Sequence, residues 1–434
     1  MQGQLPVTMK KLIDEVKTIF SDDPKAQELF ENCFSNTYET TIRPQEDGTT
    51  FVITGDIPAM WLRDSAAQVR PYLMLAEHDE KMADLIEGVI QKQFSFINHD
   101  PYANAFNEEA NGNRYHDDNT EMTPLLWERK YEIDSLCYPI QLGFLFWKST
   151  GRTSHFNETF RRAAELIIET FKTEQNHAED STYHFERDNC PPQDTLSHNG
   201  KGAPVAYTGM TWSGFRPSDD ACKYGYLIPA NMFAVVSLKQ LAEIAEEVLK
   251  DTGLVKAALD LAEEIDQGIQ QHGKVEHPEF GSIYAYETDG FGNYNLMDDA
   301  NVPSLLSLPY LGYCDVDDPI YQNTRKFILS EENPYYYQGN VAKGIGSPHT
   351  PEHYIWHIAL AIQGMTAAST EEKEEIFELF KRTDAATNFM HEGFHVDNPE
   401  KFTRPWFSWA NSMFSEFLLT KCNRFVKGSP LAKQ

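Results

Sequence analysis

Three segments of the sequence carry carboxyl, guanidinium and aromatic side chains at spacings that suit the recognition and cleavage of a sugar. In the first, Trp61, Arg63 and Asp64 lie at the expected start of a helix. An aromatic ring offers a flat apolar face to the C–H groups of a pyranose, and the charged pair forms directional hydrogen bonds with hydroxyl groups. The same residues would also serve as a helix cap with an ion pair, so this segment alone leaves both interpretations open.

The other two segments supply carboxyl groups, and cleavage of an acetal requires two of them, one protonated and one ionised. The candidates are the adjacent Asp219 and Asp220, and Glu392 between histidine and glycine. Two neighbouring carboxylates repel each other, which raises the pKa of one and favours a protonated acid. Ser218 is a candidate N-cap for a helix that begins at the pair, so one Asp could instead support that cap. Glu392 could equally be a solvated carboxylate.

Further polar and aromatic clusters between the expected helices extend the candidate sugar site. Each combines a Gly or Pro turn, an aromatic ring and a carboxylate or histidine. One such cluster alone would more often be structural, but their recurrence at helix ends indicates one shared rim. The candidate substrate-binding residues are Met60, Trp61, Arg63, Asp64, His116, Asp117, Asp134, Arg216, His349, His353, Trp356, Phe394 and Asn411.

The sequence lacks the usual motifs for metal binding, for phosphate binding and for catalysis by a serine nucleophile. His349, His353 and His357 follow one another at four-residue intervals. Pro351 interrupts the first interval, however, and no HExxH pattern is present. The acidic run 315–318 lacks the glycine and the terminal glutamate of an EF-hand calcium loop. Neither a P-loop ending nor a GxSxG motif occurs. We therefore expect no metal and no cofactor.

The composition limits the partners and the compartment. The chain has 66 acidic and 37 basic residues, for a net charge of -29. Nucleic acid and anionic membrane surfaces require a basic footprint, so neither is expected as a partner. The N-terminus lacks the apolar core of a signal peptide, and no segment is long enough to span a membrane. The six cysteines show no CxxC pair, which favours free thiols. We expect a bacterial-type cytoplasmic enzyme, and the sequence leaves its oligomeric state open.

The elements that must position these clusters are predominantly helices. Hairpins are expected over 41–54 and 284–294, with Asp-Gly turns. No succession of βαβ units is present, so helix pairs joined by long connections favour an all-α (α/α)6 barrel with small β-hairpin excursions, a single catalytic domain over 1–434. Helices are expected on either side of Pro24 and over 60–76, 79–97, 122–150, 157–173, 220–246, 253–271, 318–330, 352–368, 370–391 and 405–425.

The segments Gly55–Ser65, Met210–Asp220 and His391–Phe394 resemble glycoside hydrolase family 125, whose members are exo-acting α-1,6-mannosidases. The likeness extends over nearly the whole chain. It implies an (α/α)6 barrel and metal-independent, inverting hydrolysis of terminal non-reducing α-1,6-linked mannose from mannosides and N-glycan fragments. It also implies that one Asp of the pair is the general acid and that Glu392 is the general base. The choice between the two Asp residues stays open, and we favour Asp219 as the nearer to the preceding Pro-Ser turn.

Three other functions would suit the same helical barrel. A sugar epimerase would depend on His349, His353 and His395 and not on Glu392, whereas a phosphorylase would need a cationic phosphate pocket. A non-catalytic sugar-binding protein would keep its ligand affinity after replacement of both Asp219 and Asp220. We favour the hydrolase, with a mannose-containing oligosaccharide as its substrate.

Overall fold

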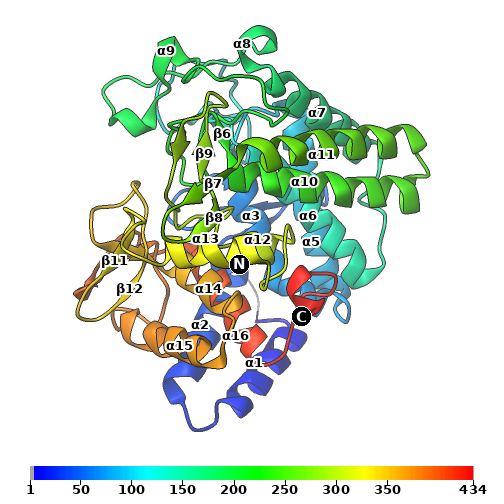
Figure 1. Cartoon of the computed structure of the whole chain (residues 1–434). Coiled ribbons are helices and arrows are strands. Elements are labelled where there is room, and N and C mark those ends of the chain that lie inside the picture. The colour runs from blue at the N-terminus through cyan, green and yellow to red at the C-terminus, as the bar shows by residue number, and fades with distance from the viewer. Residues whose placement is uncertain (1–3, 434) are drawn as a thin grey trace.

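Helices dominate the regular structure of residues 4–433, the part of the chain that the computed structural model describes (Figure 1). The α-helices are α1 Val7–Ile19, α2 Pro24–Thr40, α3 Leu62–Val69, α4 Leu73–Ala76, α5 Glu80–His99, α6 Ile133–Thr150, α7 Glu158–Gln175, α8 His177–Asp180, α9 Ser197–Gly200, α10 Ile228–Ile244, α11 Thr252–His272, α12 Leu308–Leu311, α13 Pro319–Ile328, α14 His357–Met365, α15 Thr370–Thr383 and α16 Ser408–Lys421. Short 3-10 or π turns are η1 Arg70–Tyr72, η2 Pro192–Asp194, η3 Ala245–Leu249 and η4 Pro430–Lys433.

The strands are short and form small antiparallel sheets. They are β1 Ile42–Pro44, β2 Thr50–Val52, β3 Met60–Trp61, β4 Ala105–Phe106, β5 Leu126–Glu128, β6 Tyr226–Leu227, β7 Lys274–His277, β8 Gly281–Tyr284, β9 Glu287–Thr288, β10 Tyr294–Asn295, β11 Tyr336–Gln338, β12 Lys343–Ile345, β13 Tyr354–Trp356, β14 Gly393–His395 and β15 Asn398–Phe402. The three-stranded sheets have the orders β3-β4-β5, β10-β9-β6 and β13-β14-β15, and β1-β2, β7-β8 and β11-β12 are hairpins. Both predicted hairpins are confirmed, as β1-β2 and β9-β10.

The helices divide into those that are buried almost throughout and those that bury one face. Every residue of α3 is buried, and α6, α10 and α16 are buried along most of their length. These inner helices contact one another in the succession α16, α3, α6 and α10. Outer helices such as α5, α7, α11 and α15 bury one stripe and present polar residues to solvent, as amphipathic helices do. Figure 1 shows α11 lying alongside α10, against which it packs.

Inner and outer helices also begin differently. The outer helices α5, α7, α11 and α15 begin with side-chain caps, at Asp79, Asn157, Asp251 and Ser369, that accept backbone N–H groups of the first turn. The inner helices α3 and α10, and also α14, have no side-chain cap, and each follows directly on a strand of a three-stranded sheet. The small sheets therefore fix the starts of these helices, which leaves their first N–H groups available to neighbouring polar side chains.

Three predicted helix starts near the candidate site are wrong. The helix expected from residue 352 begins only at His357, because Tyr354–Trp356 forms strand β13. The helix expected from residue 122 begins only at Ile133, because Leu126–Glu128 pairs with β4 as a strand. The helix expected from residue 220 begins only at Ile228, because Phe215 and Ala221 form a β-bridge around a tight turn. Ser218 is therefore not an N-cap, and its hydroxyl instead donates to Asp299.

One hydrophobic cluster extends from Met9 to Leu431 and includes residues of inner and outer helices. Within residues 4–433, no helix is both long enough and apolar enough to cross a bilayer. All six cysteines are free, with Cys33 and Cys137 buried and the other four partly exposed.

Candidate active site

A hollow of about 350 Å³ lies at the N-terminal ends of inner helices α3 and α16 and beside the start of α14. Its walls come from segments that lie far apart in the sequence. They are Thr54, Ile57, Trp61, Arg63, Asp64, Pro217, Ser218, Asp219, Asn301, His349, Trp356, Glu392, Arg404, Phe407 and Trp409. Carboxyl groups, guanidinium groups, an imidazole and aromatic rings thus face one space, which we call the central cavity.

Aromatic side chains form a rigid wall of the central cavity. Trp61 and Trp409 are 5% and 1% exposed, and their indole N–H groups meet no acceptor among the described residues. Trp356 is held by a hydrogen bond of 2.9 Å from its Nε1 to Thr350 Oγ1. Flat rings with free N–H groups supply both apolar contact and hydrogen bonds, which suits a pyranose.

The Arg63 guanidinium is surrounded by four carboxyl groups. Nη1 donates to Glu132 Oε2 at 2.5 Å and to Asp134 Oδ2 at 3.3 Å. Nη2 donates to Asp219 Oδ1 at 3.0 Å, and Nε lies 3.4 Å from Asp64 Oδ1. The Arg63 side chain is only 3% exposed, so these charges interact with little solvent screening.

Burial changes the protonation of these carboxyl groups. It raises the pKa of Asp64 and of Asp134 to about 6, and that of Glu132 well above its usual range, even though Arg63 opposes the change. Burial also acts to raise the pKa of Asp219, but Arg63 outweighs it and holds that pKa below the usual range. The four groups are therefore not all ionised at neutral pH.

Asp219 reaches the cavity because of an unusual backbone turn. Its φ of 67° lies in the left-handed region, at the end of a turn in which its N–H donates to Arg216 O at 2.9 Å. Lys130 Nζ donates a hydrogen bond of 2.6 Å to the backbone carbonyl of Asp219, which helps to hold the turn in place. The side chain keeps 24% exposure, whereas Asp220 next to it is fully buried.

His349 links Asp220 to the cavity wall. Its Nδ1 lies 2.9 Å from Asp220 Oδ1. Burial acts to lower the pKa of His349, but the bond to Asp220 and the charge of Glu392 outweigh it and raise the pKa to about 9. The imidazole is thus positively charged at neutral pH and donates its Nδ1–H to Asp220.

Glu392 lies immediately before β14, at the opposite end of the sequence from Arg63. Its side chain is 8% exposed, and its Oε1 lies 3.6 Å from Arg404 Nη1. Arg404 also pairs with Asp56, so it is anchored independently of Glu392. This carboxylate therefore lines the cavity next to a fixed cation, and within residues 4–433 it accepts no hydrogen bond that would prevent it from binding a water.

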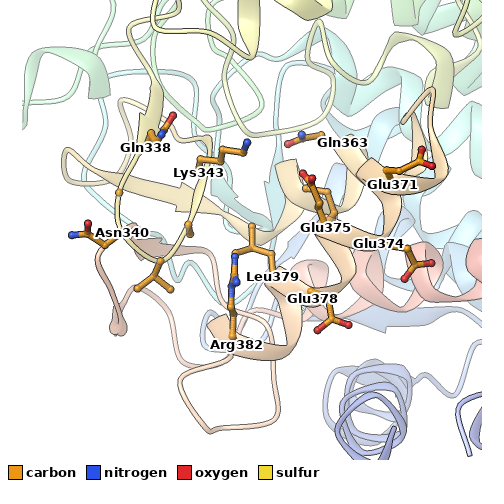
Figure 2. Close-up of a pocket in the computed structure, with 14 residues that line it drawn as sticks. Gln338, Asn340, Lys343, Gln363, Glu371, Glu374, Glu375, Glu378, Leu379 and Arg382 are labelled. Carbon is orange, nitrogen blue, oxygen red and sulfur yellow. The ribbon is translucent and has the colours of Figure 1, made fainter. Parts of the chain in front are cut away.

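A larger hollow of about 1320 Å³ lies between the β11-β12 hairpin and α15 (Figure 2). Glu371, Glu374, Glu375 and Glu378 line it together with aliphatic stems and two basic side chains. No aromatic ring lines it, so it lacks the flat apolar face that the central cavity offers a sugar. In residues 4–433, no three His, Cys, Asp or Glu side chains are grouped so that they could hold a metal ion.

Comparison with protein families matches residues 23–419 to the family described as "Metal-independent alpha-mannosidase (GH125)". The chain belongs to glycoside hydrolase family 125. Among solved structures, it is similar to a Streptococcus pneumoniae protein described as one of a family of metal-independent alpha mannosidases and solved in a non-productive complex with alpha-1,6-mannobiose. The two are 48% identical, with a TM-score of 0.94, over 96% of this chain and 98% of the other.

One relative in sequence and one protein of the same fold show how far the likeness extends. The Meiotically up-regulated gene 157 protein of Schizosaccharomyces pombe is 42% identical, with 96% of this chain and 86% of that protein covered. Since family 125 relatives occur in a yeast and in a bacterium, membership does not by itself indicate a bacterial source. A glucoamylase from Saccharomycopsis fibuligera shares the fold, with a TM-score of 0.59 at 11% identity over 97% of this chain and 96% of the other.

In this member of family 125, several predicted residues meet at the central cavity. Those that line it are Trp61, Arg63, Asp64, Asp219, His349, Trp356 and Glu392. Asp134 and Asp220 lie directly behind this surface, one bonded to Arg63 and the other to His349. The predicted residues that line the cavity come from the three segments that carry the family resemblance and from two segments around β13.

Other predicted residues lie elsewhere. Met60 is fully buried, and its Sδ accepts the N–H of Val52. Phe394 is also fully buried and packs on His357. Asn411 caps buried backbone, since its Oδ1 accepts the N–H of Met390. None of these three side chains lines the cavity.

The remaining predicted residues are at the surface or in another ion pair. Asp117 is 94% exposed, and His116 next to it is half-buried, with its Nδ1 3.7 Å from Asp118. His353 is exposed, at a positive φ of 66°. Arg216 is buried and pairs with Glu287 at 2.6 Å. The polar-aromatic pattern in the sequence therefore marks loops in general as well as the cavity.

Several cavity residues were missed by the sequence analysis. Arg404, Phe407 and Trp409 line the cavity although only Asn411 was chosen from their segment. The signal was present, because the segment 402–411 is rich in aromatic side chains. Glu132 lies in the same polar and aromatic segment as the chosen Asp134, but nothing in its local sequence shows that the fold turns it toward Arg63. Asn301 carried no such signal.

Proposed function

We propose that this protein is an exo-acting, inverting α-1,6-mannosidase that removes terminal non-reducing mannose from α-1,6-linked mannosides and N-glycan fragments without a metal ion. Family membership and the mannobiose-bound relative support the substrate class. The observation that carries the proposal is that Asp219 and Glu392 both line one aromatic-walled cavity. Inverting glycosidases use two such carboxyl groups, one as acid and one as base.

In the proposed reaction, Asp219 is the general acid and Glu392 the general base. Asp219 gives a proton to the glycosidic oxygen as the bond to the anomeric carbon breaks and its electron pair moves to that oxygen. A water on the opposite face of the ring attacks the anomeric carbon and gives its proton to Glu392. Asp219 is favoured over Asp220 because it lines the cavity, whereas the Asp220 carboxyl group is fully buried behind it.

The walls of the cavity suit the remaining tasks. The rings of Trp61, Trp356 and Trp409 would contact the apolar faces of mannose, and Asp64 would accept hydrogen bonds from its hydroxyl groups. Asp220 would act as a positioning residue that orients the His349 imidazolium toward the sugar. Inner helices α3 and α16 present their positive N-terminal ends here, which suits a site lined by carboxyl groups and sugar hydroxyl groups.

The proposal also includes the architecture of the chain and the compartment in which the protein acts. The succession of contacts among inner helices supports an (α/α)6 barrel, and the continuous core supports a single catalytic domain over 1–434. Six free cysteines support a reducing compartment such as the cytoplasm.

The deciding experiment is proton NMR of the purified protein with α-1,6-mannobiose in phosphate-free buffer that contains EDTA. Early appearance of β-mannose is the expected result, because water attacks from the face opposite the leaving group. Early α-mannose would contradict the two-carboxyl roles. No release without phosphate, followed by release with it, would indicate a phosphorylase, and binding without any release would indicate a sugar-binding protein.

A further inference from the structure

Glu132, which the proposed mechanism does not use, lies directly against its acid. Glu132 Oε2 accepts hydrogen bonds from Arg63 Nη1 at 2.5 Å and from Ser135 Oγ at 2.9 Å. Its other oxygen, Oε1, is buried and meets no N–H or hydroxyl donor among the described residues. The side chain is fully buried, so bulk water does not reach it.

The Glu132 and Asp219 carboxyl groups nevertheless bond to the two terminal nitrogens of one guanidinium, Nη1 and Nη2 of Arg63, which places the two acids side by side. Ionised carboxylates are acceptors only, so two of them cannot form a hydrogen bond. One proton between the two groups makes the contact favourable and removes one negative charge from a buried site. This arrangement is the one found when two carboxyl groups share a site in an active centre.

The charges around the pair do not remove the need for that proton. From α3, Arg63 faces both groups, and Asp64 adds a further carboxyl group. From α6, Asp134 shares Arg63 Nη1 with Glu132. Beside Asp219, Lys130 binds the backbone carbonyl and not the carboxylate, and the remaining nearby cation is His349. Among the cations of residues 4–433, Arg63 is therefore the one that bonds to both carboxyl groups of the pair, and it also contacts Asp64 and Asp134.

We propose that Glu132 and Asp219 share a single proton in the free enzyme, and that Glu132 is a positioning residue that keeps a proton available to the general acid. The inference rests on the proposed function in one respect only, the role of Asp219 as acid. On cleavage, the shared proton passes from Asp219 to the leaving oxygen, and both carboxyl groups of the pair are left ionised beside Arg63. The water's proton is then on Glu392, and a solvent proton restores the pair.

The first test compares substrates that differ in their need for a proton. Glu132→Gln keeps the shape of the side chain but has no acidic proton, and its amide N–H stabilises ionised Asp219. We expect kcat for α-1,6-mannobiose to fall by about 10²-fold with little change in KM. With a dinitrophenyl α-mannoside, whose leaving group needs no proton, we expect activity within about fivefold of the wild type. The alkaline limb of the kcat profile should move to lower pH. Equal losses for both substrates with an unmoved pH profile would overturn the proposal.

The control is Glu416→Gln, which alters another buried Glu–Arg contact, that with Arg70, away from the cavity. Both variants lose a buried ion pair and should show lower melting temperatures. Only Glu132→Gln should alter the dependence on the leaving group. If Glu416→Gln shows the same dependence, the effect is a general consequence of destabilisation and the proposal is wrong.

A second readout does not depend on activity. Infrared difference spectra of wild type minus Glu132→Gln at neutral pH should show loss of a carboxylic-acid C=O band. Loss of an ionised carboxylate band instead would overturn the proposal of a shared proton, whatever the kinetic results. Asp219→Asn separates the two claims. Full mannobiose hydrolysis by that variant would refute Asp219 as the acid, while the spectrum of wild type minus Glu132→Gln would still report on the shared proton.

Discussion

At the scale of single residues, the two carboxyl groups that line the cavity have different neighbours. Asp219 contacts Arg63 and Glu132, in a group where protons are retained. Among the described residues, the ion-pair partner of Glu392 is Arg404, whose Nη1 lies 3.6 Å from Glu392 Oε1. An acid needs a proton at hand and a base needs to be ionised, so the surroundings of the two groups match the opposite roles proposed for them.

Asp219→Asn should lower kcat for α-1,6-mannobiose by about 10²- to 10⁴-fold, because the leaving sugar departs without a proton. Hydrolysis of a dinitrophenyl α-mannoside should fall far less, since that leaving group is stable as an anion. Steady-state kinetics with both substrates measures the difference. A matched loss on the two substrates would contradict the assignment of Asp219 as acid.

Glu392→Gln should lower the hydrolysis of both substrates by about 10²- to 10⁴-fold, because activation of water is needed whatever the leaving group. The same two assays therefore distinguish base from acid. Thermal melts followed by circular dichroism serve as the control for folding. Retained activity on the dinitrophenyl substrate would exclude Glu392 as the base.

His349 gives a prediction for stability against pH. Its pKa is raised from 6.5 to about 9 in the folded protein by the bond to Asp220. The folded state therefore binds a proton more tightly than the unfolded state, and the resulting stability is full below pH 6.5 and lost as pH rises through about 9. His349→Asn keeps a donor for Asp220 but does not titrate. The melting temperature of wild type relative to this variant should decrease between these pH values, and a constant difference would refute the coupling.

At the scale of elements, short strands bring helix starts to the cavity. β3 runs into α3, and β13 runs into α14, so Trp61 and Trp356 stand at the junctions. The start of α16 is fixed differently, by a β-bridge between Gly55 and Phe407 and by a bond from Ser408 N to Thr54 O at 3.1 Å. The loop before β3 and the loop before α16 are therefore bonded directly to each other.

The contact between these two loops depends on Gly55. It has a φ of +132°, and a Cβ there would lie 2.5 Å from Trp406 O. Gly55→Ala should destabilise the fold by more than about 1 kcal/mol and raise KM, because the loops that carry Trp61 and Arg404 would separate.

Gly48→Ala is the matched control for this prediction. Gly48 also has a positive φ, of +84°, but nothing lies within 4 Å of a Cβ there, and it sits in the distant β1-β2 turn. This variant should lower the melting temperature slightly and leave KM unchanged. A similar effect of both variants on KM would show that the bridge does not organise the cavity.

The sequence predicted elements well where local signals decide them. The helix expected over 79–97 is α5, Glu80–His99, because Asp79 supplies a cap and the apolar period is regular. The starts of α6 and α10 were wrong because pairing with distant strands determines them. Leu126–Glu128 has no periodicity that distinguishes a strand from a helix turn, so only its partner β4 reveals its state.

The same contrast holds for the candidate site. Trp61, Arg63 and Asp64 were predicted together, because they lie in one continuous segment with a family resemblance. Glu132 was missed because its contact with Arg63 joins residues 69 positions apart. His116 was chosen on its local pattern, but the tertiary fold leaves it outside the cavity lining.

At the scale of the whole molecule, the net charge of -29 contrasts with a neutral substrate. Salt screens repulsion among surface charges but hardly affects uncharged hydroxyl groups. We expect the melting temperature to rise with sodium chloride between about 0.05 and 0.5 M while KM for mannobiose stays within about twofold. A steep change in KM would indicate that the natural ligand carries charge.

The bridge between Gly55 and Phe407 also has a consequence for protein synthesis. Early helices leave the ribosome long before α16, yet the cavity lacks its Phe407 and Trp409 wall until that last helix docks against α2 and α3. A nascent chain therefore cannot act on glycans at any intermediate length. Activity should begin in one step once α16 has docked, and a premature stop before residue 404 should give a protein with no residual turnover.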